Sequence, residues 1–171
     1  MKLNKILLAG VMTLGVSVAN ADSGSVNFSG QVVDTPCSID ADSLDQNVPF
    51  GTIALGSLAP GASSPGKTFD IKLIGCDTTT VNTAEITFNG DAGHGDTFGV
   101  KGGAKNIGIL ITGAQGPIAP GGSDTRTLVD GNNPLRYEAA VVADPAGETD
   151  PLKAVTAGNF TSVANFNIAY Q

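Results

Sequence analysis

The sequence of 171 residues has no tryptophan, a single histidine, two cysteines, two tyrosines and seven phenylalanines. One histidine and scattered carboxylates give few ways to assemble an acid, a base and a nucleophile, which argues against an enzyme and against a bound cofactor. Basic side chains are also scarce, nine against sixteen acidic ones. An acidic surface is repelled by phosphates, so we expect no nucleic acid and no anionic membrane among the partners.

The single histidine, His94, lies in a glycine-rich stretch between Asp91 and Asp96. A flexible loop holds metal ligands or acid-base groups poorly, and no second histidine is available. The acidic stretch 143–150 lacks the regular spacing of an EF-hand loop, and we interpret it as a solvated loop. The sequence therefore predicts no metal site in either place.

Long hydrophobic runs are absent except for one, Ile6–Val18, which follows Lys2 and Lys5 and ends before Ala19-Asn20-Ala21. The basic start, the short apolar centre and the small residues at the end are typical of a secretory signal peptide cleaved after Ala21. The run is too short for a hydrocarbon core that needs roughly 20 residues. We expect residues 1–21 to be removed, which leaves one domain with a net charge of −9.

Both cysteines, Cys37 and Cys76, lie in the part expected to be exported. Paired cysteines form disulfides in oxidising compartments, so we expect one bond between them. Two thiols and His94 are too few ligands for a structural zinc ion. A bridge that closes a loop of about 40 residues contributes roughly 4 kcal/mol in the chain-entropy account.

The rest of the chain indicates an all-β protein, because 23 glycines and nine prolines punctuate short segments in which apolar and polar residues alternate. Turn-forming stretches such as 60–66, 89–93, 120–123 and 130–134 separate these segments. This pattern favours an Ig-like β-sandwich, although two cysteines so close in sequence argue for a variant of it. The expected strands are 26–33, 68–74, 84–88, 107–112, 135–142 and a C-terminal strand ending at Tyr170.

The two ends of the exported part carry the most informative patterns. At the C-terminus, Phe166, Ile168 and Tyr170 share one face of the expected strand. At the N-terminus, Val26, Phe28, Gly30 and Val32 alternate with polar residues in the same way. The pattern alone allows either an ordinary first strand of the sandwich or a strand that waits for a partner. Gly30 adds no buried surface among apolar neighbours, which predicts a close approach there.

The segment from Gly24 to Cys37 resembles the start of chaperone-usher pilins, especially the major subunits of type 1 fimbriae. The other end agrees with this resemblance, since Tyr170 is the penultimate residue and Gly158 is the fourteenth from the C-terminus. Further likeness lies around Asp45-Gln46, in Phe69–Leu73 before Cys76-Asp77, and in Asp91–His94. The resemblance spans the whole of the expected mature chain.

The resemblance implies an incomplete Ig-like sandwich that lacks its last strand, leaving a groove which a donor strand from a neighbouring subunit completes. The chain would then divide into a signal peptide (1–21), an N-terminal donor-strand extension (22–35) and a pilin domain (36–171). The implied donor residues are Val26, Phe28, Gly30 and Val32. The implied acceptor groove and chaperone-binding edge include Gly158, Phe166, Ile168 and Tyr170.

The implied function is a structural subunit of a surface fimbria that supports cell adhesion. Export through the periplasm, a periplasmic pilus chaperone, an outer-membrane usher and head-to-tail contacts with identical subunits are part of that implication. A minor pilus subunit or tip adaptor is the alternative, and a secreted lectin-like binding module is a weaker one. The overall likeness favours the rod subunit.

Overall fold

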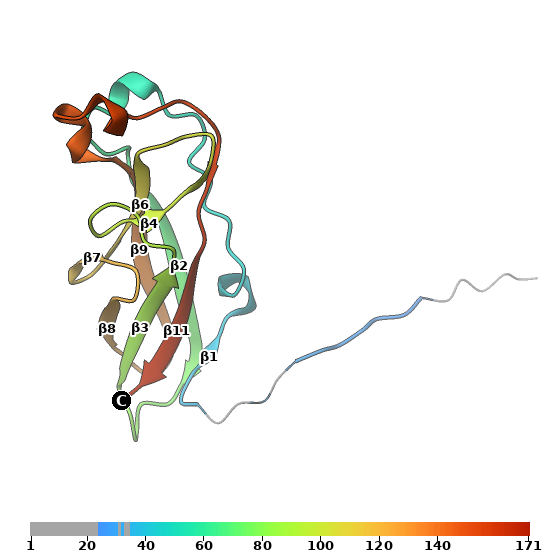
Figure 1. Ribbon diagram of the computed structural model, residues 1–171. Coiled ribbons are helices and arrows are strands. Elements are labelled where there is room, and N and C mark those ends of the chain that lie inside the picture. Colours follow the sequence, from blue (N-terminus) through green and yellow to red (C-terminus); the bar gives the residue numbers. More distant parts are fainter. Residues whose placement is uncertain (1–23, 31, 33–34) are drawn as a thin grey trace, which may run out of the picture. The chain divides into compact units, whose positions relative to one another are not determined.

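The computed structural model describes residues 24–30, 32 and 35–171 (Figure 1). Two larger β-sheets and one short two-stranded pair make up the described domain, and every strand pair is antiparallel. The larger sheet contains β1 (Ser38–Ile39), β2 (Lys67–Cys76), β4 (Phe98–Gly99), β6 (Ile107–Gly113), β7 (Gly116–Ile118) and β9 (Gly131–Ala143). The smaller sheet contains β3 (Thr83–Gly90), β8 (Ser123–Thr127) and β11 (Ala164–Tyr170).

The order of strands in the larger sheet is β1-β2-β9-β6-β4, with β7 hairpinned onto β6, and in the smaller sheet it is β11-β3-β8. A separate short pair joins β5 (Lys101–Gly102) to β10 (Phe160–Thr161). Figure 1 shows β3 and β11 running side by side in the smaller sheet. The smaller sheet therefore has two outer strands, β11 and β8.

Short 3-10 turns occupy several of the connections: η1 (Ala41–Ser43), η2 (Leu55–Ser57), η3 (Pro145–Glu148) and η4 (Pro151–Lys153). The acidic stretch 143–150 has a structural use here, because the carboxylate of Asp144 accepts a hydrogen bond from the Ala146 amide at the start of η3. Asp150 caps η4 in the same way. Among the described residues, no helical segment is long and apolar enough to cross a membrane.

The core lies between the two sheets, where the alternating strands turn their apolar residues toward one another. Ile71 of β2 and Ile86 of β3 are fully buried. An aromatic cluster links the sheets: the ring of Phe88 in β3 lies 5.0 Å from that of Tyr137 in β9, and Phe69 of β2 stacks on Tyr137 at 5.6 Å between ring centroids. Such contacts between rings hold the two layers together beyond their burial alone.

The structure confirms the strands expected at 68–74, 84–88, 107–112, 135–142 and the C-terminus, each with one face more buried than the other. These segments were predictable because one face of each meets the apolar core.

The expected first strand, 26–33, is the exception. Its described residues, 24–30 and 32, form no strand, and Val26, Phe28 and Val32 are largely exposed. A strand needs hydrogen bonds to a neighbouring strand, and among the described residues no strand pairs with this segment. Gln31, Val33, Asp34 and the expected signal peptide lie outside the described residues.

Candidate functional site: a groove beside the C-terminal strand

Strand β11 has a hydrogen-bonded neighbour on one side only. It pairs with β3 along its whole length, from Ala164 opposite Gly90 to Tyr170 opposite Ala84. In the part of the chain that the structure describes, no strand pairs with its other edge. That edge therefore presents main-chain N–H and C=O groups that another strand could bond.

The side chains of β11 alternate as the sequence predicted. Phe166, Ile168 and Tyr170 are partly buried and pack against the core, whereas Asn165 and Asn167 are exposed. Burial raises the pKa of the Tyr170 hydroxyl above its ordinary value. The inward face of this strand is thus part of the core as well as the border of an open edge.

A cavity of about 510 Å³ opens beside the start of β11. One wall is the irregular segment 43–48, which follows η1, and the other is the segment 162–166. Its floor is apolar and comes from both sheets: Phe69, Ile71, Phe88, Phe98, Ile109, Ile111 and Ala139. Leu44 and Val163, on opposite walls, are 64% and 70% exposed, so apolar surface also lines the rims.

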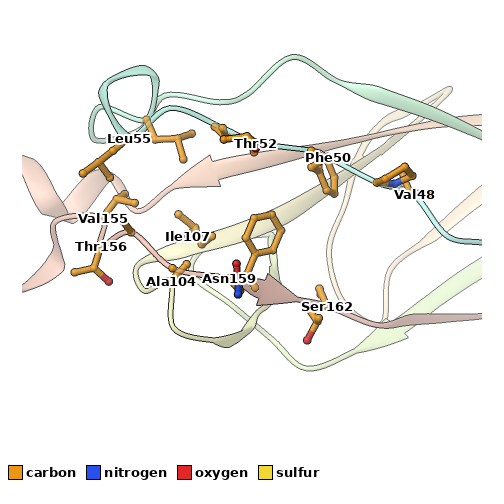
Figure 2. Close-up of a pocket in the computed structure, with 18 of the residues that line it drawn as sticks. Val48, Phe50, Thr52, Leu55, Ala104, Ile107, Val155, Thr156, Asn159 and Ser162 are labelled. Carbon is orange, nitrogen blue, oxygen red and sulfur yellow. The ribbon is translucent and has the colours of Figure 1, made fainter.

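A second cavity of about 720 Å³ continues the first, since Asn47, Val48 and Ser162 line both. Figure 2 shows Val48, Phe50 and Thr52 along one wall and Asn159 and Ser162 along the other, with Ile107 and Ala104 between them. We call the two cavities together the edge groove. It is long and open, its floor consists of apolar core side chains, and its exposed rims are apolar as well.

The comparisons with known proteins agree with this geometry. A family model described as fimbrial protein matches residues 26–171. The Fimbria A protein of Serratia marcescens is 45% identical over the full length of both chains, and the major MR/P fimbria protein of Proteus mirabilis is 38% identical, also over the full length of both. The chain belongs to the fimbrial protein family.

Solved structures extend the likeness to the fold. The crystal structure of the P pilus rod subunit PapA matches with a TM-score of 0.70 and 34% identity, over 80% of this chain and all of that one. A subunit in the structure of a chaperone-usher pilus matches with a TM-score of 0.79 and 35% identity, over 91% of this chain and all of the other. The incomplete Ig-like sandwich expected from the sequence is confirmed.

This pilin is a major structural subunit of surface fimbriae, and it polymerises with like subunits. The rod-subunit reading is therefore confirmed over a minor subunit, a tip adaptor or a secreted lectin-like module. The family is structural and not enzymatic, as the scarcity of catalytic side chains indicated.

The pilin's Gly158 lines the wider cavity, and its backbone passes against Gly103 and Ala104. A Cβ at Gly158 would overlap the main chain of both residues. The amides of Gly103 and Ala104 donate to the Asn159 carbonyl at 2.8 and 3.1 Å. Gly158 is thus required by close contact between two segments of the same chain, which sets the wall of the edge groove.

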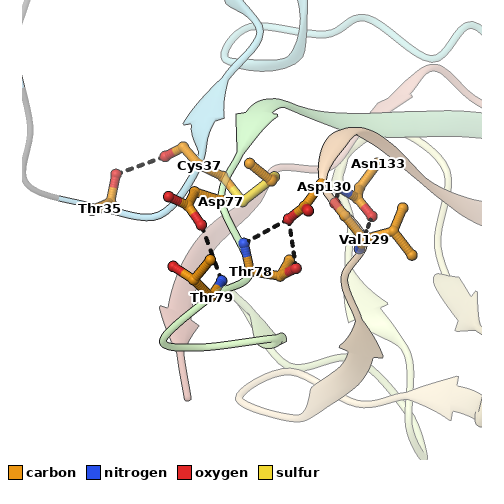
Figure 3. Close-up of a disulfide and its surroundings, with 9 residues drawn as sticks. Thr35, Cys37, Asp77, Thr78, Thr79, Val129, Asp130 and Asn133 are labelled. Atoms are coloured by element: carbon orange, nitrogen blue, oxygen red, sulfur yellow. Dashed lines mark hydrogen bonds between the residues drawn. A yellow bond between two sulfur atoms is a disulfide. The ribbon is translucent and has the colours of Figure 1, made fainter.

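The disulfide between Cys37 and Cys76 is present, with 4.1 Å between the Cα atoms. It joins the residue just before β1 to the last residue of β2. Figure 3 shows the hydrogen bonds that surround it. The Thr35 hydroxyl donates to the Cys37 carbonyl, and both the amide and the hydroxyl of Thr78 donate to one oxygen of Asp130, which lowers the pKa of that carboxyl. The disulfide and these hydrogen bonds therefore fix the start of the domain at Cys37.

The structure places only some of the predicted acceptor residues at the edge groove. Ile168 and Tyr170 pack on the core but do not line either cavity, whereas Phe166 and Gly158 do. The ring of His94 contacts the Val142 carbonyl at 3.1 Å through Nε2, and Asp91 pairs with Lys101 at 2.8 Å. The described residues contain no cluster of metal-ligating side chains.

Sequence reasoning missed the wall of the edge groove opposite the segment 155–166. Val48, Phe50 and Ile53 contribute to it from a stretch that pairs with no strand among the described residues. Such a segment has no periodicity to follow. The available signal was a set of apolar residues, Val48-Pro49-Phe50 and Ile53, in a stretch too short and irregular for a strand.

Proposed function

We propose that the edge groove of one pilin receives the N-terminal extension of the next, residues 22–35, by donor-strand exchange. The observation that supports this is the groove itself, where an unpaired strand edge borders a cavity with an apolar floor and exposed apolar rims. A strand laid along β11 would gain main-chain hydrogen bonds, and every second side chain would point into the floor. Residues 26–32 alternate in the way such a strand requires.

The donor side chains have enough apolar surface to hold subunits together. Val26, Phe28 and Val32 are 76%, 91% and 101% exposed in the single chain. Full burial of each would contribute roughly 1.5 to 3 kcal/mol. Gly30 would contribute by leaving space where the donor backbone lies close to the floor. Because donor and acceptor are different surfaces, the contact is head-to-tail and repeats into a filament.

We further propose that a periplasmic chaperone covers the groove before polymerisation and that an outer-membrane usher directs the exchange. An exposed apolar groove with a free strand edge is prone to aggregate, so an exported subunit needs a cover until its neighbour arrives. Residues 1–21 would direct export to the periplasm, where the disulfide between Cys37 and Cys76 forms. The resulting fimbria would support adhesion of the cell.

A substitution that respects the alternation tests the donor assignment. Changing Val26, Phe28 and Val32 to Ser together should leave a subunit that is exported and bound by the chaperone but makes no fibres, because the groove is intact and only donation is lost. The matched control changes Asn27 and Ser29, on the other face, to Ala and should give normal fibres. Fibre yield on the cell surface and co-purification with the chaperone are the two measurements. Normal fibres from the triple variant would rule out these donor residues.

A further inference from the structure

The opposite outer strand of the smaller sheet, β8, also has only one strand neighbour among the described residues, β3. A free edge on this side would offer a second place for a donor strand. The structure differs there in one respect: the inward residues of β8 are charged. Asp124 is 1% exposed, and its carboxylate pairs with the guanidinium of Arg126, two residues along on the same face.

Arg126 closes the gap between the two sheets on this side. Its Nη2 donates to the carbonyl of Arg136 in β9 at 3.0 Å, and its Cζ lies 5.1 Å from the ring centroid of Tyr137. The side chain of Arg126 therefore reaches from the smaller sheet to the larger one. It occupies space between the two sheets behind β8.

The β6–β7 hairpin completes this closure from the larger sheet. At Gly113, a Cβ would lie 2.8 Å from the carboxylate carbon of Asp124, so the absence of a side chain makes room for the buried charge. The Gln115 side chain donates through Nε2 to the Thr125 carbonyl at 3.3 Å. The N–H and C=O of one residue in an antiparallel strand point to the same side, and at Thr125 that side is the outer edge of β8. The bond from Gln115 therefore occupies one of the carbonyl groups that a donor strand would need.

The ion pair is poorly suited to stabilise the fold. One carboxylate oxygen of Asp124 and the hydroxyl of Tyr137 are buried without a hydrogen-bond partner among the described residues. A buried charge with an unsatisfied oxygen is costly, and apolar residues of similar size often serve stability as well or better. Inward-pointing charges on an outer strand are, however, a recognised means of preventing strand addition.

We propose that Asp124 and Arg126, with Gln115, prevent a donor strand from pairing with the edge of β8. Each pilin would then accept a neighbouring subunit's donor strand at β11 alone. This inference rests on the proposed donor-strand exchange and assigns its directionality to specific residues. A donor strand beside β8 would have to place apolar side chains against a buried carboxylate and the guanidinium that pairs with it. The pilin thus has one acceptor edge, and the filament does not branch.

The test measures how much donor peptide intact fibres bind. Fibres are purified from cells that produce the full chain and are incubated with a labelled synthetic peptide that has the sequence of residues 24–35. Wild-type fibres should bind only background amounts, since β11 is occupied by the next subunit and β8 is closed. The D124V/R126V variant should bind roughly one peptide per subunit, because a free strand edge with apolar inward residues takes an added strand.

Two control variants locate the binding. T125V/T127V makes the same kind of change on the exposed outward face of β8 and should stay at background. T125P added to D124V/R126V should return binding to background, because the Thr125 N–H faces away from β3 and proline removes that donor from the edge. Binding that persists with T125P, or background binding by intact D124V/R126V fibres, would overturn the inference.

If D124V/R126V yields no fibres, the near-isosteric D124N/R126Q variant takes its place. It removes both charges and keeps hydrogen-bonding groups of similar shape, and it should bind peptide above background. Background binding by D124N/R126Q would equally overturn the inference. A failure of donor-strand exchange itself is distinguishable, because fibres would then still form when Val26, Phe28 and Val32 are changed to Ser.

Discussion

Strands β11 and β8 are the two outer strands of the same three-stranded sheet. The inward side chains differ in kind, because they are apolar or aromatic on β11 and charged on β8. Beside β11 the inward residues are Phe166, Ile168 and Tyr170, and a cavity opens between the sheets at the start of the strand, beside Phe166. Beside β8 the inward residues are Asp124 and Arg126, and the space is closed. An unpaired strand edge therefore becomes an acceptor or a boundary according to the side chains behind it.

The aromatic cluster connects the two sides through the core. From the closed side, Arg126 lies over Tyr137, whose ring is 5.0 Å from Phe88. Phe88 is in turn 6.4 Å from Phe166 on the open side and forms part of the groove floor. The open side thus lacks a strand over an otherwise complete core. On the closed side, polar contacts cover the core.

The largest expected effect comes from removing the open side altogether. Deleting Ala164–Gln171 takes away β11, which exposes β3 and the aromatic cluster to water, and we expect no folded subunit and no chaperone complex to accumulate. Periplasmic subunit level and co-purification with the chaperone are the measurements. The control, Asn165→Ala, changes only an exposed side chain of the same strand and should leave both unchanged. A stable complex from the truncated chain would show that β11 is not the acceptor edge.

A smaller effect is expected from Gly158→Ala, which distorts one wall of the open side without removing it. The added Cβ would overlap the main chain at Gly103 and Ala104, so the two segments must separate. Overpacking of this kind typically costs about 1 to 3 kcal/mol. We expect a lower urea midpoint for loss of β circular dichroism and a lower fibre yield. Gly56→Ala serves as the control, because a Cβ there meets nothing within 4 Å. Equal midpoints for the two variants would contradict the close-contact role of Gly158.

How much the sequence predicts also differs between the two sides. The open side's strand was predictable, because Phe166, Ile168 and Tyr170 alternate with polar residues up to the end of the chain. Strand β8, with the sequence Ser-Asp-Thr-Arg-Thr, was not predicted. Its inward residues are charged, which reverses the pattern on which strand prediction depends. Arg126 contacts Arg136 and Tyr137 from another part of the chain, which local sequence cannot indicate.

The groove wall shows a second reason why the sequence did not predict the whole site. Phe50 faces Phe160 with 6.1 Å between ring centroids, although more than a hundred residues of chain separate them. Neither belongs to a long strand, so the pairing depends on tertiary packing and not on periodicity. The resemblance to pilins implied a groove along the C-terminal strand. The residues of its far wall became identifiable only in the folded chain.

The smallest expected effect appears only at high pH and concerns the pilin's two tyrosines, one on each side of the sandwich. Because the chain has no tryptophan, these tyrosines can be followed by their ultraviolet absorbance. Burial, and then the nearby Asp124 carboxylate, raise the pKa of Tyr137 far above its ordinary value on the closed side, whereas burial alone raises the pKa of Tyr170 on the open side. A folded-state pKa above the unfolded value of about 10 favours the folded state below that pH, and this contribution is lost as the pH rises further.

Tyrosinate absorbance of purified fibres, corrected for scattering, should therefore show Tyr170 ionising first while the sandwich stays folded. Tyr137 should ionise only together with the loss of β circular dichroism, and Tyr137→Phe should remove that cooperative step and shift unfolding to higher pH. Ionisation of Tyr137 in fibres that keep their β structure would show that the closed side admits water and hydroxide, which would contradict the tight closure by Arg126.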